Sequence, residues 1–167
     1  MSPRVLTPVP LTKESFAPFG TVIEVEGAQS YLINEGTTTR FHKMAVADTD
    51  EDGGQSIISV FRGTARAEPV EIKMMERHPI SSQAFYPLSN HDWLVVVADA
   101  VSTPGPEHLH AFLATGIQGV QYARNVWHHP LLPLVSEQDF LIVDRAGSGD
   151  NLEELFFPET VIATIDR

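Results

Sequence analysis

The feature of this sequence that most constrains its fold is a series of short apolar segments, each closed by glycine, proline, asparagine or aspartate. Segments of this kind, spaced roughly 8–12 residues apart, are typical of a β-sandwich or β-barrel. Because no crossover helices separate them, we predict an all-β fold with antiparallel pairing in two packed sheets. We expect eleven strands, at Thr21–Val25, Tyr31–Ile33, Phe41–Val46, Ser56–Phe61, Val70–Met75, Ser82–Tyr86, Trp93–Ala98, His110–Ala114, Gly119–Tyr122, Phe140–Asp144 and Thr160–Ile165.

Three segments call for a more specific interpretation. Trp93–Ala98 is apolar without alternation, which predicts a central strand covered on both faces. Leu11–Phe19 is predicted to contain a helical turn with Thr12 as its N-cap. Asn151–Phe156 fits either a helical turn or an edge strand, and the pattern does not decide between them.

Composition limits the classes of function. The 167 residues, 43% of them hydrophobic, suit one domain spanning residues 1–167. A net charge of -11 predicts no nucleic-acid and no membrane partner, and the absence of cysteine excludes disulfides and thiol chemistry. Prolines interrupt the N-terminal segment before a signal-peptide core can form, and no apolar run reaches the ~20 residues of a membrane span. A cytoplasmic location is therefore expected.

Polar side chains that enzymes use are concentrated in a few places. Gln118–Leu131 holds amide, phenol, guanidinium, indole and two imidazole groups, and Glu76–Pro87 closes one predicted strand and opens the next. Arg40 and His42 are two residues apart, so an extended strand would place both on one face. Asn34 suits either a turn or a binding role.

These residues identify a family resemblance. The chain closely resembles the ureidoglycolate lyases of allantoin degradation, an arm of purine metabolism. The resemblance covers nearly the whole chain and includes Asn34, Gly36, Arg40 and His42 near its start. Its motifs are Glu76-Arg77-His78-Pro79, Gln83-Ala84-Phe85, Gly119-Val120, Tyr122, Trp127-His128-His129-Pro130-Leu131, Asp139-Phe140-Leu141 and Asp144-Arg145.

The resemblance implies a fold and an activity. The fold would be a cupin-like antiparallel β-barrel or sandwich of the jelly-roll type with few short helices, and the protein would form a homodimer. The activity would be that of a carbon–nitrogen lyase that splits (S)-ureidoglycolate into glyoxylate and urea.

The cupin resemblance also raises the question of a metal. Metal-binding cupins carry a first motif of the form H-x-H-x(3,4)-E, and a second motif adds one histidine. The matching register here is Glu76, His78 and Gln83, with His128 or His129 from the second motif. A glutamate replaces one histidine and a glutamine replaces the glutamate, so the set has fewer strong ligands for a divalent transition metal such as nickel. The metal requirement is left open, and no organic cofactor is expected.

The reaction needs a base and an acid. Removing the hemiaminal hydroxyl proton lets the carbonyl form while the C–N bond breaks and a urea nitrogen gains a proton. We expect Glu76 paired with His128 or His129 to carry these transfers. Adjacent strand residues face opposite sides, and the second cupin motif favours His128 as the inward one.

The small anionic substrate also needs binding groups. Arg40 and Arg124 are the predicted partners of its carboxylate, because a guanidinium matches a carboxylate with two hydrogen bonds. Arg145, next to Asp144, is interpreted instead as one half of an ion pair. The remaining predicted substrate contacts are Asn34, His42, Gln83, Gln118, Tyr122 and Trp127.

Two other functions compete with the lyase. An amidohydrolase would release ammonia from the same substrate, but near the His128 pair the sequence has no H-x-H motif and no second carboxylate. A non-enzymatic cupin-like protein that binds a small carboxylate would need an arginine-lined pocket without paired acid and base.

Overall fold

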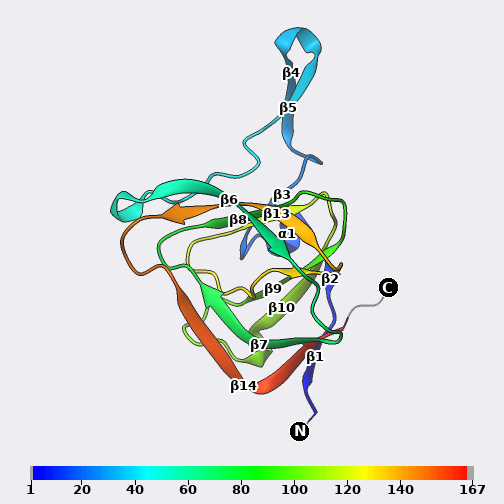
Figure 1. Cartoon of the computed structure of the whole chain (residues 1–167), viewed down its shortest axis with the longest axis vertical. Coiled ribbons are helices and arrows are strands. Elements are labelled where there is room, and N and C mark those ends of the chain that lie inside the picture. Colours follow the sequence, from blue (N-terminus) through cyan, green and yellow to red (C-terminus); the bar gives the residue numbers. More distant parts are fainter. Residues whose placement is uncertain (1, 165–167) are drawn as a thin grey trace.

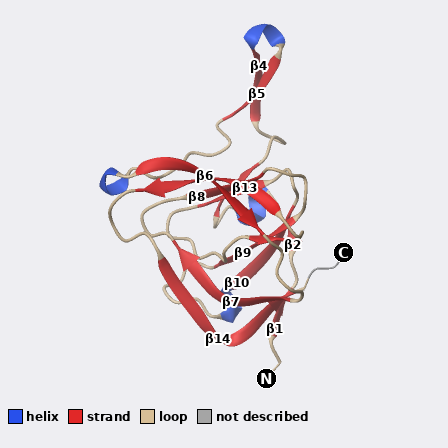
Figure 2. Cartoon of the chain, viewed as in Figure 1, coloured by secondary structure: helices blue, strands red, loops and turns tan. Residues whose placement is uncertain are grey.

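Strands are the main regular structure of the computed structural model, which describes residues 2–164 (Figures 1 and 2). All eleven predicted segments overlap a strand, which confirms the all-β class. Phe41–Val46 is strand only at its first two residues, and Ile165 lies outside the described residues.

One layer is a five-stranded antiparallel sheet. Its spatial order is β3 (Gly20–Ile23), β11 (Gly119–Tyr122), β8 (Gln83–Pro87), β13 (Gln138–Ala146) and β6 (Gln55–Gly63). β6 forms its edge. Side chains alternate along these strands, so Phe140 and Ile142 of β13 are fully buried between the layers while Leu141 and Val143 face outward.

The opposite layer consists of two sheets joined by one residue. The first holds β1 (Arg4–Leu6), β14 (Glu153–Ala163) and β7 (Val70–Arg77), and the second holds β12 (Leu132–Pro133), β9 (Trp93–Ala98), β10 (Leu109–Ala114) and β2 (Val9–Pro10). The short strands β1 and β2 pair in parallel, with β14 and β10, whereas the other pairs are antiparallel. His128 bridges Glu76 of β7 and Val97 of β9, and so fills the gap between the two sheets.

The core confirms the central strand predicted at Trp93–Ala98. All six of its residues are buried. Trp93 packs edge-on against Phe140 of the facing sheet, with ring centroids 4.9 Å apart. Alternate residues such as Leu94 instead join the apolar cluster that contains Ile72 of β7.

A two-stranded hairpin stands away from both layers (Figure 1). It consists of β4 (Gln29–Ile33) and β5 (Thr38–His42), paired antiparallel. Its tip turns through Asn34 and Glu35 with φ of 51° and 58°, in the left-handed region that asparagine tolerates well. Asn34 is therefore a turn residue.

Helical structure in residues 2–164 is confined to short pieces: α1 (Lys13–Phe16), η1 (Asn34–Gly36), η2 (Glu51–Gly53) and η3 (Pro106–His108). The predicted helical turn with its Thr12 cap is confirmed, because the Thr12 hydroxyl accepts a hydrogen bond from the Ser15 amide at 3.1 Å. No helix of the described part is long and apolar enough to span a membrane. The undecided segment Asn151–Phe156 enters strand β14 at Glu153.

The two layers form a sandwich that is open along β6 and, over residues 2–164, do not close into a continuous barrel. Ile57 and Phe61 of β6 pair with Asp144 and Phe140 and so face inward, yet they remain 38% and 40% exposed. The inner face of the edge strand β6 is therefore only partly covered.

Candidate functional site

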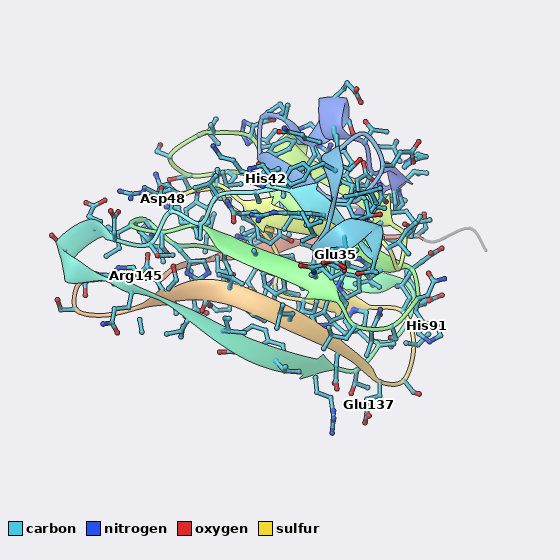
Figure 3. The ribbon with its side chains drawn as sticks, turned by 90° about the horizontal axis from the view of Figure 1, so that it is seen from above. Glu35, His42, Asp48, His91, Glu137 and Arg145 are labelled. Carbon is cyan, nitrogen blue, oxygen red and sulfur yellow. The ribbon has the colours of Figure 1, made fainter. Side chains whose placement is uncertain are left out.

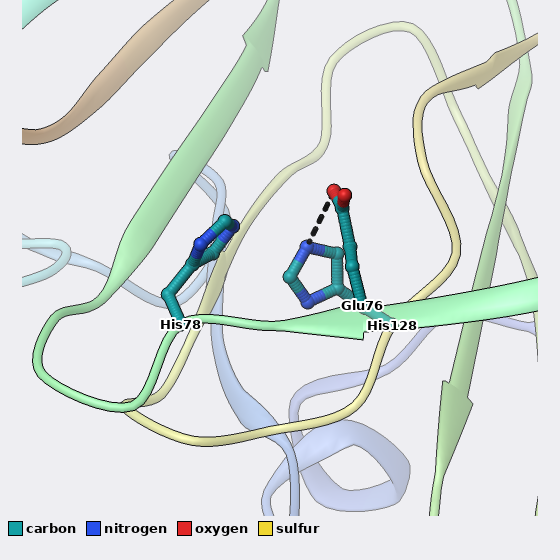
Figure 4. Close-up of side chains that lie close together, drawn as sticks. All are labelled: Glu76, His78 and His128. Atoms are coloured by element: carbon teal, nitrogen blue, oxygen red, sulfur yellow. Dashed lines mark ion pairs between the residues drawn. The ribbon is translucent and has the colours of Figure 1, made fainter. Parts of the chain in front are cut away.

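Glu76 and His128 lie side by side because their backbones pair. Each amide donates to the other residue's carbonyl at 2.8 Å. Directly opposed residues of an antiparallel pair project on the same face. Nε2 of His128 therefore lies 3.5 Å from Oε1 of Glu76 (Figure 4).

Three more side chains complete the cluster. His78 follows Glu76 by two residues, and one nitrogen or oxygen from each of Glu76, His78 and His128 lies within 4.8 Å of the others. Gln83, at the start of β8, brings its Oε1 to 2.9 Å from Nε2 of His78. The Tyr122 ring stacks on His128 with centroids 4.0 Å apart and planes within 7°. The fold thus gathers residues of both motif-rich segments in one place.

The protonation states of Glu76 and Tyr122 differ. Burial alone would raise the pKa of Glu76, but the neighbouring imidazoles, His128 first, lower it overall, so the carboxylate is ionised at neutral pH. Burial, with a smaller contribution from the Glu76 charge, raises the pKa of Tyr122 far above its ordinary value. Tyr122 therefore remains protonated, and Glu76 is the proton acceptor of this pair.

The tautomer of His128 follows from its backbone contact. Nδ1 donates to the Val126 carbonyl at 3.0 Å, so in the neutral ring the lone pair is on Nε2. That nitrogen is buried and has no hydrogen-bond partner among the described residues. A buried polar atom without a partner is unusual and suggests a ligand in the space it faces.

The donor set fits a divalent transition metal. Nδ1 of His78 donates to the Asn151 carbonyl at 2.8 Å, which leaves its Nε2 lone pair directed into the cluster. A backbone carbonyl holding the far nitrogen is the usual arrangement for a metal-binding histidine. Two such imidazoles with the ionised Glu76 carboxylate suit a metal such as nickel or zinc.

His129 lies in a different environment from His128. It is 3% exposed and its Nδ1 donates to the Pro130 carbonyl at 2.8 Å. Burial lowers the pKa of His129 to about 4. It is therefore neutral in the folded protein over the whole physiological range.

This burial predicts a pH-dependent stability. In the unfolded chain a histidine titrates near pH 6.5, so between pH 6.5 and 4 the unfolded state binds a proton that the folded state rejects. The free energy of unfolding should fall by up to about 3 kcal/mol over that range because of His129. Urea unfolding of His129→Gln at pH 7 and 4.5 should show a smaller loss than the wild type.

The exposed His91 supplies the matched control for this measurement. His91→Gln should keep the wild-type difference between the two pH values. An unchanged difference in His129→Gln would contradict the assignment.

The hairpin carries Arg40, His42 and Asn34 away from this cluster. Figure 3 shows Glu35 and His42 over the five-stranded sheet, with Asp48 and Arg145 toward one end and His91 and Glu137 toward the other. His42 lies 3.4 Å from the Tyr31 hydroxyl, and Asn34 donates to Thr38 at 3.3 Å. A single chain therefore does not bring these predicted substrate contacts to Glu76 and His128.

Three other predicted contacts also have different surroundings. Arg124 pairs with both Asp48 and Glu51. Gln118 organises a turn, where it donates to the Leu11 carbonyl and to Glu24. Trp127 packs in the core, and the guanidinium carbon of Arg77 lies over its indole, 4.3 Å from the centroid of the ring.

The predicted ion pair between Asp144 and Arg145 is wrong. Adjacent strand residues face opposite sides, and Arg145 donates instead to the Glu51 and Ser148 carbonyls. Asp144 faces inward and accepts from Nε2 of Gln83 at 3.1 Å. Asp144 and Asn151 are thus neighbours of the cluster that the sequence interpretation did not include.

A hollow of about 290 Å³ lies beside the cluster and is lined by His78, Ser81, Asp144, Arg145, Asn151 and Leu152. It has room for a small organic acid next to His78. Its walls combine imidazole, hydroxyl, amide and carboxylate groups, as a polar ligand would require.

A family model described as ureidoglycolate lyase matches residues 3–164. Proteins named ureidoglycolate lyase from Brucella melitensis biotype 2, Stutzerimonas stutzeri and Pseudomonas entomophila are 56%, 53% and 50% identical to this chain over 159, 156 and 156 residues. The alignments cover 95%, 93% and 93% of this chain, and 94%, 92% and 93% of the respective relatives.

Proposed function

Since this chain belongs to the ureidoglycolate lyase family, we propose that the cluster of Glu76, His78 and His128 is where it splits ureidoglycolate into glyoxylate and urea. The chain is a lyase by family and by its similarity to the named relatives. The observation that supports this location is the buried Nε2 of His128, unpartnered and facing an ionised carboxylate.

The chemistry of the substrate matches these groups. Glu76 accepts the proton of the hemiaminal hydroxyl as the carbonyl of glyoxylate forms. The C–N bond breaks, its electron pair stays on the urea nitrogen, and that nitrogen takes up the proton held by Glu76. The proton that Glu76 takes from the hydroxyl is the one that it returns to the urea nitrogen, so no other proton donor is needed. The imidazole of His128 lies next to Glu76 in both steps.

A bound metal would be held by Nε2 of His78 and His128 with oxygens from Glu76 and Gln83. It would act as a Lewis acid on the oxygen atoms of the substrate. The second oxygen of Glu76 would still be free to accept the proton.

Binding of the substrate carboxylate by Arg40 or Arg124, and a contribution of His129, Asn34, His42, Gln118, Tyr122 or Trp127, stay predictions. The single-domain organisation and the cytoplasmic location also stay predictions.

The test is to incubate the purified chain with ureidoglycolate, before and after treatment with a chelator, and to quantify glyoxylate, urea and ammonia. We expect equal amounts of glyoxylate and urea. Release of ammonia in place of urea would contradict the lyase reaction and support the amidohydrolase. Loss of turnover on chelation, with recovery on adding Ni²⁺, would establish the metal requirement.

We also propose that the chain forms a homodimer through the outer face of the five-stranded sheet. Register places Ile58 and Val60 of the edge strand β6 opposite Val143 and Leu141, on the outward side. Ile58 and Val60 are 72% and 55% exposed. A groove of about 430 Å³ continues this apolar face along Leu141, Val143, Ala84, Tyr86, Ile23 and Met44.

The hairpin of a second copy suits this face. An isolated hairpin is marginally stable in water, and this one exposes Tyr31, Leu32 and Phe41. Residues 29–43 carry Arg40 and Lys43 against Glu35, a net charge of +1, which leaves -12 for the rest of a chain whose total is -11. Apolar surface and charge therefore both favour packing of the hairpin on another copy in a reciprocal two-fold arrangement.

Charge placed on either surface should break the dimer. Wild-type protein should sediment at twice the chain mass of 18.4 kDa, whereas Leu32→Asp in the hairpin and Ile58→Asp in β6 should sediment as monomers at micromolar concentration. Phe156→Asp is the control, because Phe156 is 67% exposed on the opposite layer. A monomeric wild type would contradict the proposal, as would dimers in both hairpin and sheet variants.

A further inference from the structure

The orientation of the Gln83 amide is fixed by the residue behind it. Gln83 is 6% exposed, and its Nε2 donates to Oδ2 of Asp144 at 3.1 Å. The carboxylate oxygen of Asp144 accepts this hydrogen bond, so the NH₂ group of the amide faces Asp144. The carbonyl oxygen of Gln83 is thereby turned toward His78.

This arrangement brings two acceptor atoms together. Oε1 of Gln83 lies 2.9 Å from Nε2 of His78. The other nitrogen of His78 donates to the Asn151 carbonyl, so in the neutral ring Nε2 carries a lone pair. A lone pair on Nε2 facing Oε1 of Gln83 needs a positive charge against both atoms, which either a proton on Nε2 or a metal ion supplies.

Facing acceptor atoms that need a positive charge between them also occur on the other side of the cluster. Nε2 of His128 is buried, has no hydrogen-bond partner within residues 2–164 and lies 3.5 Å from Oε1 of Glu76. Glu76, His78 and His128 each place one ligand atom within 4.8 Å of the others, and Oε1 of Gln83 adjoins Nε2 of His78, so one divalent cation can bind this donor set.

We propose that Asp144 is a positioning residue that turns Gln83 into the fourth ligand of a divalent transition metal. Glutamine is a weak ligand, and it serves here only if its oxygen, rather than its nitrogen, faces the cluster. Asp144 enforces that choice from the strand next to β8, and it reaches the metal only through Gln83. The proposal rests on the cluster assigned above, but it concerns metal binding and not the reaction.

Exchanging the partner tests the idea. In Asp144→Asn the new amide at position 144 can donate to Oε1 of Gln83, which draws that oxygen away from His78. Outer partners of metal ligands typically change affinity by about 10–100-fold. Chelator-treated full-length protein titrated with Ni²⁺ by calorimetry should bind about one ion per chain in the wild type, and Asp144→Asn should bind it about 10–100-fold more weakly.

A second substitution, at Gln83, should restore the Ni²⁺ affinity that Asp144→Asn removes. Gln83→Glu alone places two carboxylates against each other, whereas in the double variant Gln83→Glu/Asp144→Asn the new amide can donate to one oxygen of the new carboxylate. The other oxygen then faces the metal. The double variant should bind Ni²⁺ at least as tightly as the wild type, which a merely structural role of Asp144 would not produce.

Asp139→Asn supplies the control, because Asp139 lies on the same strand but pairs with Arg62 at the surface, with 2.9 Å between Nε and Oδ1. It should bind Ni²⁺ as the wild type does. The proposal is overturned if the wild type binds no Ni²⁺, if Asp144→Asn binds it with wild-type affinity, or if the double variant is no tighter than Asp144→Asn. Urea formation is measured separately, so an inactive protein that binds Ni²⁺ in the expected order would leave this inference standing and reject only the reaction.

Discussion

Replacing His128 with alanine should lower kcat by about 100-fold or more while the protein stays folded. The side chain is 1% exposed, and its Nε2 is the buried nitrogen that faces Glu76 without a partner. Alanine removes the atom that contacts the reacting groups or the metal that holds them. Steady-state kinetics of glyoxylate formation would measure the effect.

The neighbouring His129 provides a control that distinguishes a loss of catalysis from a loss of packing. His129 is equally buried but hydrogen-bonds to the Pro130 carbonyl, so His129→Gln should keep kcat within a few-fold of the wild type at pH 7.5. The opposite result, with kcat lost in His129→Gln and kept in His128→Ala, would mean that the side chain of His129, and not that of His128, faces the reacting groups. Nickel content measured on the same samples distinguishes two roles. Loss of the ion together with kcat identifies Nε2 as a ligand, and an unchanged content means that His128 acts on the substrate or on Glu76 directly.

Much of the fold could be predicted because its strands are marked locally. Trp93–Ala98 is apolar at every position and is buried at every position. The strands β1, β2 and β12 could not be predicted, because each has only two or three residues and exists through pairing with β14, β10 or β9. Nothing in such short segments distinguishes them from loop.

The residues of the site could be predicted from the sequence, but the contacts between them could not. The motifs contained Glu76, His78, Gln83 and His128, yet their meeting depends on a backbone pairing between segments far apart in the sequence. Asp144 was misinterpreted because its charged neighbour Arg145 suggested an ion pair. Counting by two from the buried Phe140 and Ile142 would have placed Asp144 on the inner face.

The substitution with the largest expected effect on stability lies on the same inner face of β13. Phe140 is fully buried, and its ring packs edge-on against Trp93, so it joins the five-stranded sheet to the central strand of the other layer. Phe140→Ala should lower the free energy of unfolding by about 3–5 kcal/mol, because it loses buried area and leaves a cavity. That is a large part of the ~5–15 kcal/mol that holds a typical domain folded, and it should lower the Tm by about 10 °C.

Phe156 provides the matched control, since it carries the same side chain on β14 but is 67% exposed. Phe156→Ala should change the free energy of unfolding by no more than about 0.5 kcal/mol. Urea unfolding of both variants followed by tryptophan fluorescence measures the difference, and Trp93 reports directly on the neighbourhood of Phe140. Equal effects of the two substitutions would mean that the layers are not held together at this contact. The sandwich would then have to depend on the other cluster, around Ile72 and Leu94.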